Sequence, residues 1–361
     1  MEANNSEFID HLTDKGFYVA SQSHSNYAST ELSIASSLNM EYINYLSENI
    51  GIKSKNYMLL GKMIKNNKVM RFLKSKGYKF VHFSSGWVVT KHNPYADLEF
   101  SFTDITEFSV LLLQTSILRP FLKHFILNDV RGAILHTFDK IAEVPEIKDP
   151  TFVFAHILTP HENIPPPHEY LFGDTYQDQL PIINKKLLTL AEAILSKSNF
   201  PPIIIFQSDH GTAFTGEFEQ PTEKFIRERM SILNAYYLPA DGKMLLYESI
   251  TPVNSFRLIF MHYLGANFDL LGDYSYFSDY EHPYKFTDVT NMLTKEYTPT
   301  HCQDRKLGFL RWIHHRLLKQ LERREPEGRP ECQLLRRTPR LGCGSPKPGV
   351  IADYYKVQNT G

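Results

Sequence analysis

Short apolar runs alternate along the chain with amphipathic stretches, and this alternation predicts strands and helices in turn. The clearest run covers 203–206; two prolines precede it, and it leads into Asp209-His210-Gly211. A short apolar run between chain breakers is typical of a strand buried on both faces, as in a parallel sheet that helices cover. Further strands are predicted over 17–20, 78–83, 151–155 and 231–238.

Apolar residues at helical spacing predict helices between these strands. The predicted helices cover 5–15 (with Ser6 as its cap), about ten residues from Glu31, then 57–76, 105–127 with a break at Pro120, 131–143, 178–197 and a segment that ends at Gly265. Residues 84–104 and 212–228 are polar and are expected to form loops. The repeated order strand, helix, strand predicts an α/β fold with a mainly parallel sheet and right-handed crossovers.

Composition restricts the class of protein. The chain has 361 residues, of which 42% are apolar and 13% aromatic, as in a globular protein. Its formal net charge of -1 argues against a uniformly basic nucleic-acid binder. The sequence has no apolar run long enough to predict a transmembrane helix, and its first residues do not have the pattern of a signal peptide. The location of the protein is therefore left open.

A change in composition predicts a boundary near residue 295. All three cysteines lie beyond it, and residues 300–361 hold 13 Lys and Arg against 6 Asp and Glu. We expect a main domain over 1–295 and a basic tail over 296–361. Residues 305–324 form a candidate amphipathic helix that would bind a membrane surface or a partner. The alternative is a solvated or partly disordered appendix, or the product of an altered reading frame.

Asp209 and His210 follow the strand over 203–206. Ligands of open α/β sheets collect beyond the carboxyl ends of the strands, and Gly211 allows the chain to turn there. A carboxylate beside an imidazole at such an end is a plausible pair of metal ligands. The alternative is that Asp209 caps the next segment and His210 packs in a loop.

Three further residues are candidates for the same site. Thr30 stands at the start of a predicted helix, where it would be either an N-cap or a nucleophile beside an anion site. His156 ends the strand over 151–155, and His161 follows in a Pro-His loop. Taken singly, a loop histidine is more often simply solvated.

Longer stretches resemble a known family. They are SNYASTELSIASSLNMEYI, RFLKSKGYKFVHFSSGW, FVFAHILTPH, YQDQLPIINKKLL, IIIFQSDHG, SILNAYYLP and SITPVNSFRLIFMHYLG. In this order, over residues 5–292, they resemble the sulfatase-like branch of the alkaline phosphatase superfamily, in particular a membrane-anchored group related to lipoteichoic acid synthases. The resemblance implies a three-layer α/β/α sandwich around a mainly parallel sheet.

The resemblance also implies chemistry. It suggests a metal-dependent hydrolase or transferase that acts on phosphate or sulfate esters, with Thr30 as nucleophile. Asp209, His210 and Thr30 would bind a divalent metal ion, either Mn, Zn, Mg or Ca. His161 matches a substrate-binding histidine, and His156 is a weaker candidate. The substrate would be linked to a lipid or a glycan, nucleic acid is not an expected partner, and the basic tail offers a contact with a membrane surface.

One feature of the family has no counterpart in this sequence. The family's first strand precedes the nucleophile and carries an acidic metal ligand, whereas the sequence starts with MEANNSEFID, past that strand. We therefore expect a sheet without its first strand and a metal site without that ligand. The alternative function is a catalytically inactive relative that at most binds an anionic ligand.

Overall fold

A computed structural model describes residues 5–102, 107–117, 119, 122–161 and 175–294. The chain divides into two compact units, Met1–Glu296 and Tyr297–Gly361, and every described residue lies in the first. The predicted helix over 305–324 and the rest of the basic tail lie outside the described residues.

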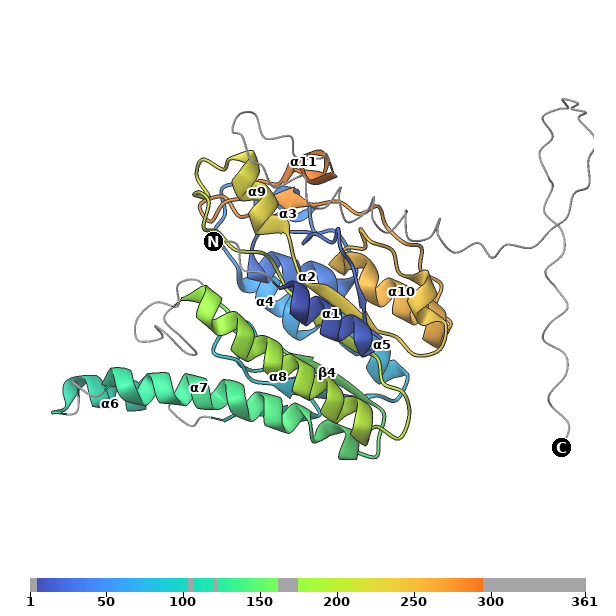
Figure 1. Cartoon of the computed structure of the whole chain (residues 1–361). Helices are drawn as coiled ribbons and strands as arrows, with labels where there is room; N and C mark the ends of the chain where they lie inside the picture. Colours follow the sequence, from blue (N-terminus) through green and yellow to red (C-terminus); the bar gives the residue numbers. More distant parts are fainter. Residues whose placement is uncertain (1–4, 103–106, 118, 120–121, 162–174, 295–361) are drawn as a thin grey trace, which may run out of the picture. The chain divides into compact units, whose positions relative to one another are not determined.

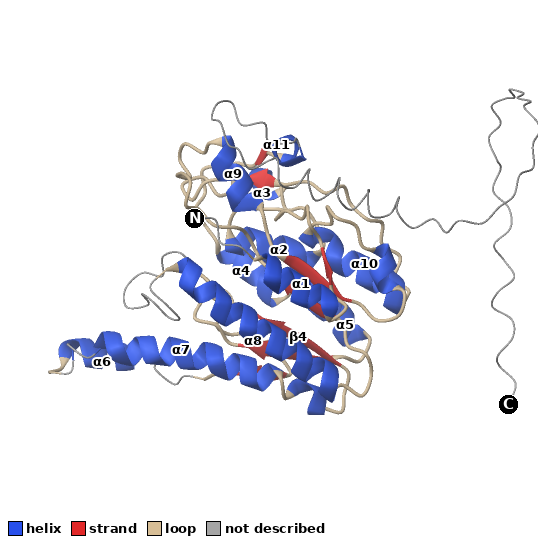
Figure 2. Ribbon diagram, viewed as in Figure 1, coloured by secondary structure: helices blue, strands red, loops and turns tan. Residues whose placement is uncertain are grey.

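The first of two three-stranded sheets is parallel, with the order β3-β2-β4 (Figure 2). Its strands are β2 (Lys79–Phe83), β3 (Leu98–Phe100) and β4 (Thr151–Ala155). Val81 of β2 pairs in register with Val153 of β4. β2 is buried after its first residue, as expected for a central strand that helices cover on both faces.

The second sheet is antiparallel, with the order β1-β6-β5. Its strands are β1 (Tyr18–Val19), β5 (Ile204–Gln207) and β6 (Asn234–Tyr237). Gln207, the last residue of β5, pairs with Asn234, the first of β6. The connection between these strands therefore stays at the carboxyl end of β5, and β6 runs back along it.

Helices cover both faces of these sheets, which confirms the predicted α/β/α sandwich (Figure 1). One layer holds α1 (Ser6–Asp14), α7 (Leu122–Ile141) and α8 (Tyr176–Lys197); the other holds α2 (Thr30–Asn39), α4 (Met58–Lys65), α5 (Lys68–Ser75) and α10 (Pro252–Leu264). Leu190 of α8 packs with Val81 of β2. On the opposite side, Phe260 of α10 packs with Tyr236 of β6.

Shorter elements complete the unit. They are α3 (Leu46–Ile50), α6 (Glu107–Thr115), α9 (Glu223–Met230), α11 (Thr290–Thr294), the turns Val144–Glu146 and Gly242–Leu245, and the pair β7 (Tyr276–Phe277) and β8 (Thr287–Asp288). None of the helices within the described ranges is long and apolar enough to cross a membrane.

Two helix predictions were wrong in their bounds. The helix over 57–76 is two helices, because Asn67 ends α4 and caps α5: its side chain accepts from Met70 N (2.7 Å) and donates to Ile64 O (2.8 Å). Conversely, the predicted helix over 131–143 and the end of the one over 105–127 form the single helix α7. The cap of α1 is also Asn5 and not Ser6.

Two predicted loops contain regular structure. β3 lies within 84–104, where Asp97 Oδ2 accepts from Phe80 N and holds the segment beside β2. α9 begins within 212–228 and continues to Met230, and Thr222 caps it by accepting from Phe225 N. Thr222 before Glu223 is a helix-start signal that the polar composition concealed.

β4 and β5 are edges of their sheets, and both border a cavity of about 2650 Å³. No strand lies between them among the described residues. The apolar run over 203–206 is consequently not buried on both faces as predicted. Ile204 is 7% exposed, but Ile203 is 40% exposed and the rest of β5 is half-buried because its free edge borders the cavity.

Candidate functional site

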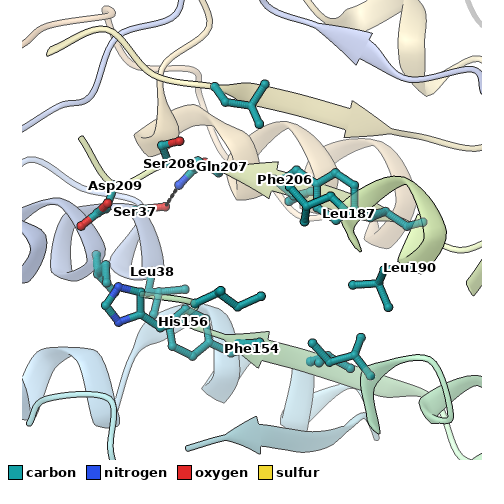
Figure 3. A pocket seen from close by; sticks show the side chains of 18 of the residues that line it. Ser37, Leu38, Phe154, His156, Leu187, Leu190, Phe206, Gln207, Ser208 and Asp209 are labelled. Atoms are coloured by element: carbon teal, nitrogen blue, oxygen red, sulfur yellow. Dashed lines mark hydrogen bonds between the residues drawn. The ribbon is translucent and has the colours of Figure 1, made fainter. Parts of the chain in front are cut away.

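All five residues predicted from the sequence line one cavity: Thr30, His156, His161, Asp209 and His210. They gather at the end toward which β4 and β5 both run, as Figure 3 shows for His156 and Asp209. Parallel placement of the two strands brings their carboxyl ends to the same edge, so the residues that follow each strand meet there.

The hydroxyl of Thr30 is not a helix cap. The N-cap of α2 is Ser29, which is extended (φ -123°, ψ 151°), and Thr30 is the first helical residue. The Ser29 side chain makes no capping hydrogen bond. The capping interpretation of Thr30 is therefore excluded, and its hydroxyl faces the cavity at the positive end of the helix.

Three donor atoms of different chemistry converge at this point. Thr30 Oγ1 lies 3.1 Å from His210 Nε2, and His210 Nε2 lies 3.4 Å from Asp209 Oδ2. His210 Nδ1 is 3.0 Å from the carbonyl oxygen of Gly211, to which its N–H donates. In the neutral imidazole, Nε2 then carries the lone pair that points toward Thr30 and Asp209.

Gly211 is required here by close approach of the backbone. A Cβ at this position would lie 2.1 Å from Glu228 O and 2.5 Å from Ser231 O. The amide of Gly211 also donates to Arg229 O over 2.7 Å. Gly211 is not among the described residues with positive φ. Glycine is therefore required here because there is no room for a side chain, and not because the backbone is left-handed.

Arg229 is a buried cation behind the site. It is 5% exposed, its Nε donates to Ala28 O (2.8 Å) and its Nη1 donates to Gly211 O (2.9 Å). The guanidinium also lies 5.0 Å from the ring centre of Phe218. One side chain of α9 therefore contacts both the loop before Thr30 and the loop after His210.

Burial and the neighbouring charges act in opposite directions on the pKa values of the site residues. Burial alone raises the pKa of Asp209, but His210, His156, a hydrogen bond with Thr30 and Arg229 outweigh it and lower that pKa from 3.8 to about 2. Burial lowers the pKa of His210 and His156, although Asp209 acts in the other direction. The site thus holds a carboxylate beside imidazoles that are neutral near pH 7.

His156 and His161 stand beside this group. His156 Nδ1 lies 2.9 Å from Thr90 Oγ1, which orients its ring. The backbone of His161 is held by Gln179 of α8, whose side chain accepts from His161 N and donates to His161 O, each at 3.2 Å. Burial and the nearby Arg229 lower the pKa of His161.

Sequence reasoning missed two charged residues of the site, Arg229 and Glu31. Glu31 lines the cavity directly after Thr30 and accepts from Trp87 Nε1 over 3.1 Å. Burial raises the pKa of Glu31, and the nearby Asp209 adds to the effect. Only its position next to Thr30 could have indicated Glu31. The sequence holds no signal for Arg229, because this residue lies between the predicted loop over 212–228 and the predicted strand over 231–238 and belongs to neither.

The three donor atoms have the spacing of ligands around one small cation. Ligands at about 2.0–2.2 Å from a tetrahedral zinc ion lie about 3.3 Å from one another. The observed separations of 3.1 Å and 3.4 Å match this value. Within the described ranges, however, no group of three or more His, Cys, Asp or Glu side chains could hold a metal ion. Thr30, Asp209 and His210 thus fit as part of a coordination shell.

Comparison with known proteins identifies the fold. The chain matches no protein-family model and no curated protein. It is similar to the zinc complex of the C-terminal periplasmic domain of EcEptC from Escherichia coli, with a TM-score of 0.52 and 13% sequence identity over 81% of this chain and 87% of that chain. Another structure of that domain covers 80% of this chain and 86% of that one, at 11% identity and a TM-score of 0.47. The likeness to the first of these structures shows that the chain shares its fold, and this fold is the α/β/α sandwich that the resemblance implied.

Proposed function

We propose that this chain is a hydrolase or transferase of phosphate or sulfate esters, with Thr30 as its nucleophile. The observation that carries the proposal is the position of Thr30 Oγ1: it lies at a helix N-terminus, makes no cap, and is 3.1 Å from His210 Nε2. A helix N-terminus favours the anionic group of such an ester. The specific relationship to the membrane-anchored, lipoteichoic acid synthase-like group is part of this proposal.

In this proposal each residue has a defined task. Thr30 Oγ1 loses its proton to solvent and forms a bond to phosphorus or sulfur, while the bond to the leaving oxygen breaks and that oxygen takes up a proton to leave as the alcohol. His161 and His156, neutral near pH 7, donate hydrogen bonds to oxygens of the transferred group. Water then releases that group from Thr30 in a hydrolase, and a second alcohol does so in a transferase.

A divalent cation would be held by Asp209, His210 and Thr30. When bound, it would lower the pKa of the Thr30 hydroxyl and offset the charge of the transferred group. The zinc in the EcEptC complex supports a divalent ion, and Mn, Mg and Ca are the alternatives. Because that domain is periplasmic, we also propose that this chain acts outside the cytoplasmic membrane, on an ester linked to a lipid or a glycan.

Hydrolysis of aryl phosphate and aryl sulfate esters, with Mn²⁺, Zn²⁺ or Mg²⁺ added, tests the proposal. Thr30→Ala should abolish turnover with an unchanged circular dichroism spectrum, because the Ser29 N-cap remains. Thr30→Ser keeps a hydroxyl and should retain part of the activity. Equal turnover in wild type and Thr30→Ala would refute a Thr30 nucleophile.

A second candidate is a relative that binds an anion without turnover. The observation that favours it is that, among the described residues, no three His, Cys, Asp or Glu side chains lie close enough together to hold a metal ion. The same assay separates the two candidates. Phosphate or sulfate binding without turnover, under every metal tested, supports the second.

A further inference from the structure

The loop that follows β2 contacts the candidate site through His156. β2 and β4 are parallel neighbours, and Phe83 at the end of β2 pairs with Ala155 at the end of β4. The chain therefore leaves both strands at the same edge of the sheet, and Thr90 of the loop after β2 meets His156, the residue after β4. Thr90 Oγ1 lies 2.9 Å from His156 Nδ1. Because Thr90 is only 1% exposed, water cannot take the place of this partner.

The hydroxyl group of Thr90 belongs to a short chain of hydrogen bonds. The backbone N–H of Trp87 donates to Ser85 Oγ over 3.0 Å, and Ser85 Oγ lies 2.7 Å from Thr90 Oγ1. The backbone closes the same turn, because Ser85 N donates to Thr90 O over 3.2 Å and Thr90 N donates to Trp87 O over 3.0 Å. The turn therefore holds both hydroxyl groups in place beside His156.

The direction of this chain of hydrogen bonds follows from where each hydrogen can go. Each hydroxyl group has one hydrogen to donate. Among the described residues, Ser85 Oγ has no acceptor other than Thr90 Oγ1, because its other partner, Trp87 N, is itself a donor. The Ser85 hydrogen therefore points to Thr90. The Thr90 hydrogen is left for His156 Nδ1 at 2.9 Å, in preference to Trp87 O at 3.5 Å.

The second ring nitrogen of His156 is consequently a donor. A neutral imidazole that accepts at Nδ1 carries its hydrogen on Nε2. Burial lowers the pKa of His156, which keeps the ring neutral near pH 7. His156 lines the cavity, and no residue in the described ranges accepts a hydrogen bond from its Nε2. The Nε2–H group is thus available to an oxygen atom of a ligand.

His210 has the opposite arrangement. Its Nδ1–H donates to Gly211 O over 3.0 Å, which leaves the lone pair on Nε2. A ring nitrogen with a lone pair can bind a metal ion, whereas one that carries a hydrogen cannot. The two histidines therefore suit different partners: His210 suits a cation, and His156 suits an oxyanion.

We propose that Thr90 is a positioning residue that fixes His156 as the Nε2–H tautomer, and that His156 consequently donates to an oxygen of the transferred group and does not bind the metal ion. Ser85 supports this role because its hydroxyl group orients that of Thr90. The inference rests on the proposed function, since it assigns His156 one task in that reaction. A phosphoryl or sulfuryl oxygen that gains charge requires a hydrogen-bond donor, which this tautomer provides.

Nuclear magnetic resonance of the full chain tests the tautomer. With isotope-labelled histidine, the chemical shifts of the ring nitrogens show which one carries the hydrogen, and the variant His156→Gln identifies the signal by its loss. We expect the hydrogen on Nε2 in the wild type. In Thr90→Val, which keeps the shape of threonine but has no donor, we expect comparable amounts of both tautomers. A wild-type hydrogen on Nδ1 would overturn the proposal even if Thr90→Val failed to fold, and so would an unchanged tautomer in a folded Thr90→Val.

Steady-state kinetics with an aryl phosphate ester and added Zn²⁺ measure the effect on the reaction. Thr90→Val should lower kcat by about tenfold to a hundredfold with little change in KM, because the hydrogen bond from His156 gains strength as charge develops in the transition state. Thr90→Ser keeps the hydroxyl group and should restore most of the loss. Thr137→Val is the matched control: Thr137 is also buried, but its Oγ1 donates to Ala133 O of its own helix, so kcat should not change. An equal loss of kcat in both valine variants would contradict a specific role of Thr90.

The proposed function and this inference can fail separately. Without turnover under any condition the proposed function fails, while the tautomer and its dependence on Thr90 still decide whether Thr90 positions His156. Loss of turnover in Thr30→Ala together with a wild-type kcat in Thr90→Val would support the proposed function and overturn the inference. Loss of the Nε2 hydrogen of His156 when Zn²⁺ is added would make His156 a metal ligand and would also overturn it.

Discussion

Arg229 donates a hydrogen bond of 2.8 Å from Nε to the carbonyl oxygen of Ala28, two residues before Thr30. Its Nη1 reaches Gly211 O, directly after His210. A single buried guanidinium therefore joins the loop of the proposed nucleophile to the loop of the proposed metal ligands. We expect the separation of Thr30 and His210 to depend on this contact.

Arg229→Lys should reduce both stability and turnover. Lysine keeps the charge, but its ammonium group lacks the planar set of N–H donors with which the guanidinium reaches both Ala28 O and Gly211 O. We expect the free energy of unfolding to fall by about 3 kcal/mol, and turnover of an aryl ester to fall by up to about a hundredfold through misplacement of Thr30. Urea denaturation and steady-state kinetics measure the two effects.

Arg227→Lys is the matched control for this substitution. Arg227 lies on the same helix and pairs with Glu223 in an (i, i+4) salt bridge of 2.8 Å near the surface. Its replacement should change the free energy of unfolding by about 0.5 kcal/mol or less. If both variants behaved alike, the role of Arg229 in placing the two loops would be wrong.

Asp209→Ala should reduce the metal content of the protein. The carboxylate is one of three donors within 3.1–3.4 Å of the next, and its loss leaves a hydroxyl and one imidazole. Elemental analysis after dialysis with Zn²⁺ or Mn²⁺ measures the bound ion. Asp241→Ala is the control, because Asp241 pairs with His262 at the surface and lies outside the site. Equal metal content in wild type and Asp209→Ala would exclude Asp209 as a ligand.

Acid should destabilise the fold in two pH windows. Burial lowers the pKa of His156, His161 and His210 from 6.5, so the stability linked to their neutral forms is present above that pH and declines below it. Asp209 has a folded pKa of about 2 against 3.8 ordinarily, so its contribution, about 2 kcal/mol, is present above pH 4 and disappears between about pH 4 and pH 2.

Urea denaturation at a series of pH values checks both windows. Asp209→Asn removes this titration and should reduce the loss between about pH 4 and pH 2 by about 2 kcal/mol, whereas the loss from other carboxylates with lowered pKa, such as Asp97 and Glu228, remains. The loss that begins near pH 6.5 should become steeper in that variant, because Asp209 raises the pKa of all three histidines. An unchanged acid profile in Asp209→Asn would contradict the low pKa of Asp209.

Gly211→Ala should be strongly destabilising, whereas Gly61→Ala should not. A Cβ at Gly211 would meet backbone oxygens at 2.1 Å and 2.5 Å, which forces the loop between β5 and α9 to move. We expect a loss of at least about 3 kcal/mol and of turnover. At Gly61, inside α4, a Cβ would lie 3.5 Å from Val89 Cγ1, an ordinary contact, so alanine should stabilise by about 0.5–1 kcal/mol. Thermal denaturation of the two variants compares them directly.

The sequence by itself determined the fold class and singled out five of the residues that line the candidate site. The run over 203–206 and the run over 151–155 each end in a polar residue of the site, and strand ends that share an edge must bring those residues together. Thr30 was found in the same way, as a hydroxyl at the start of a helix. These are local patterns with a physical cause, so one sequence suffices to show them.

Only the tertiary structure decided the rest. Arg229 joins the site because a distant segment packs there, and no local pattern indicates a contact across more than two hundred residues such as that of Arg229 with Ala28. Asn67 separates α4 from α5 because its side chain forms hydrogen bonds with the backbone of Ile64 and Met70. The spacing of apolar residues continues across this point and so does not reveal the break. The cavity between β4 and β5 is likewise a result of how the strands pair. An apolar run indicates a strand, but which edges find a partner depends on every other strand in the fold.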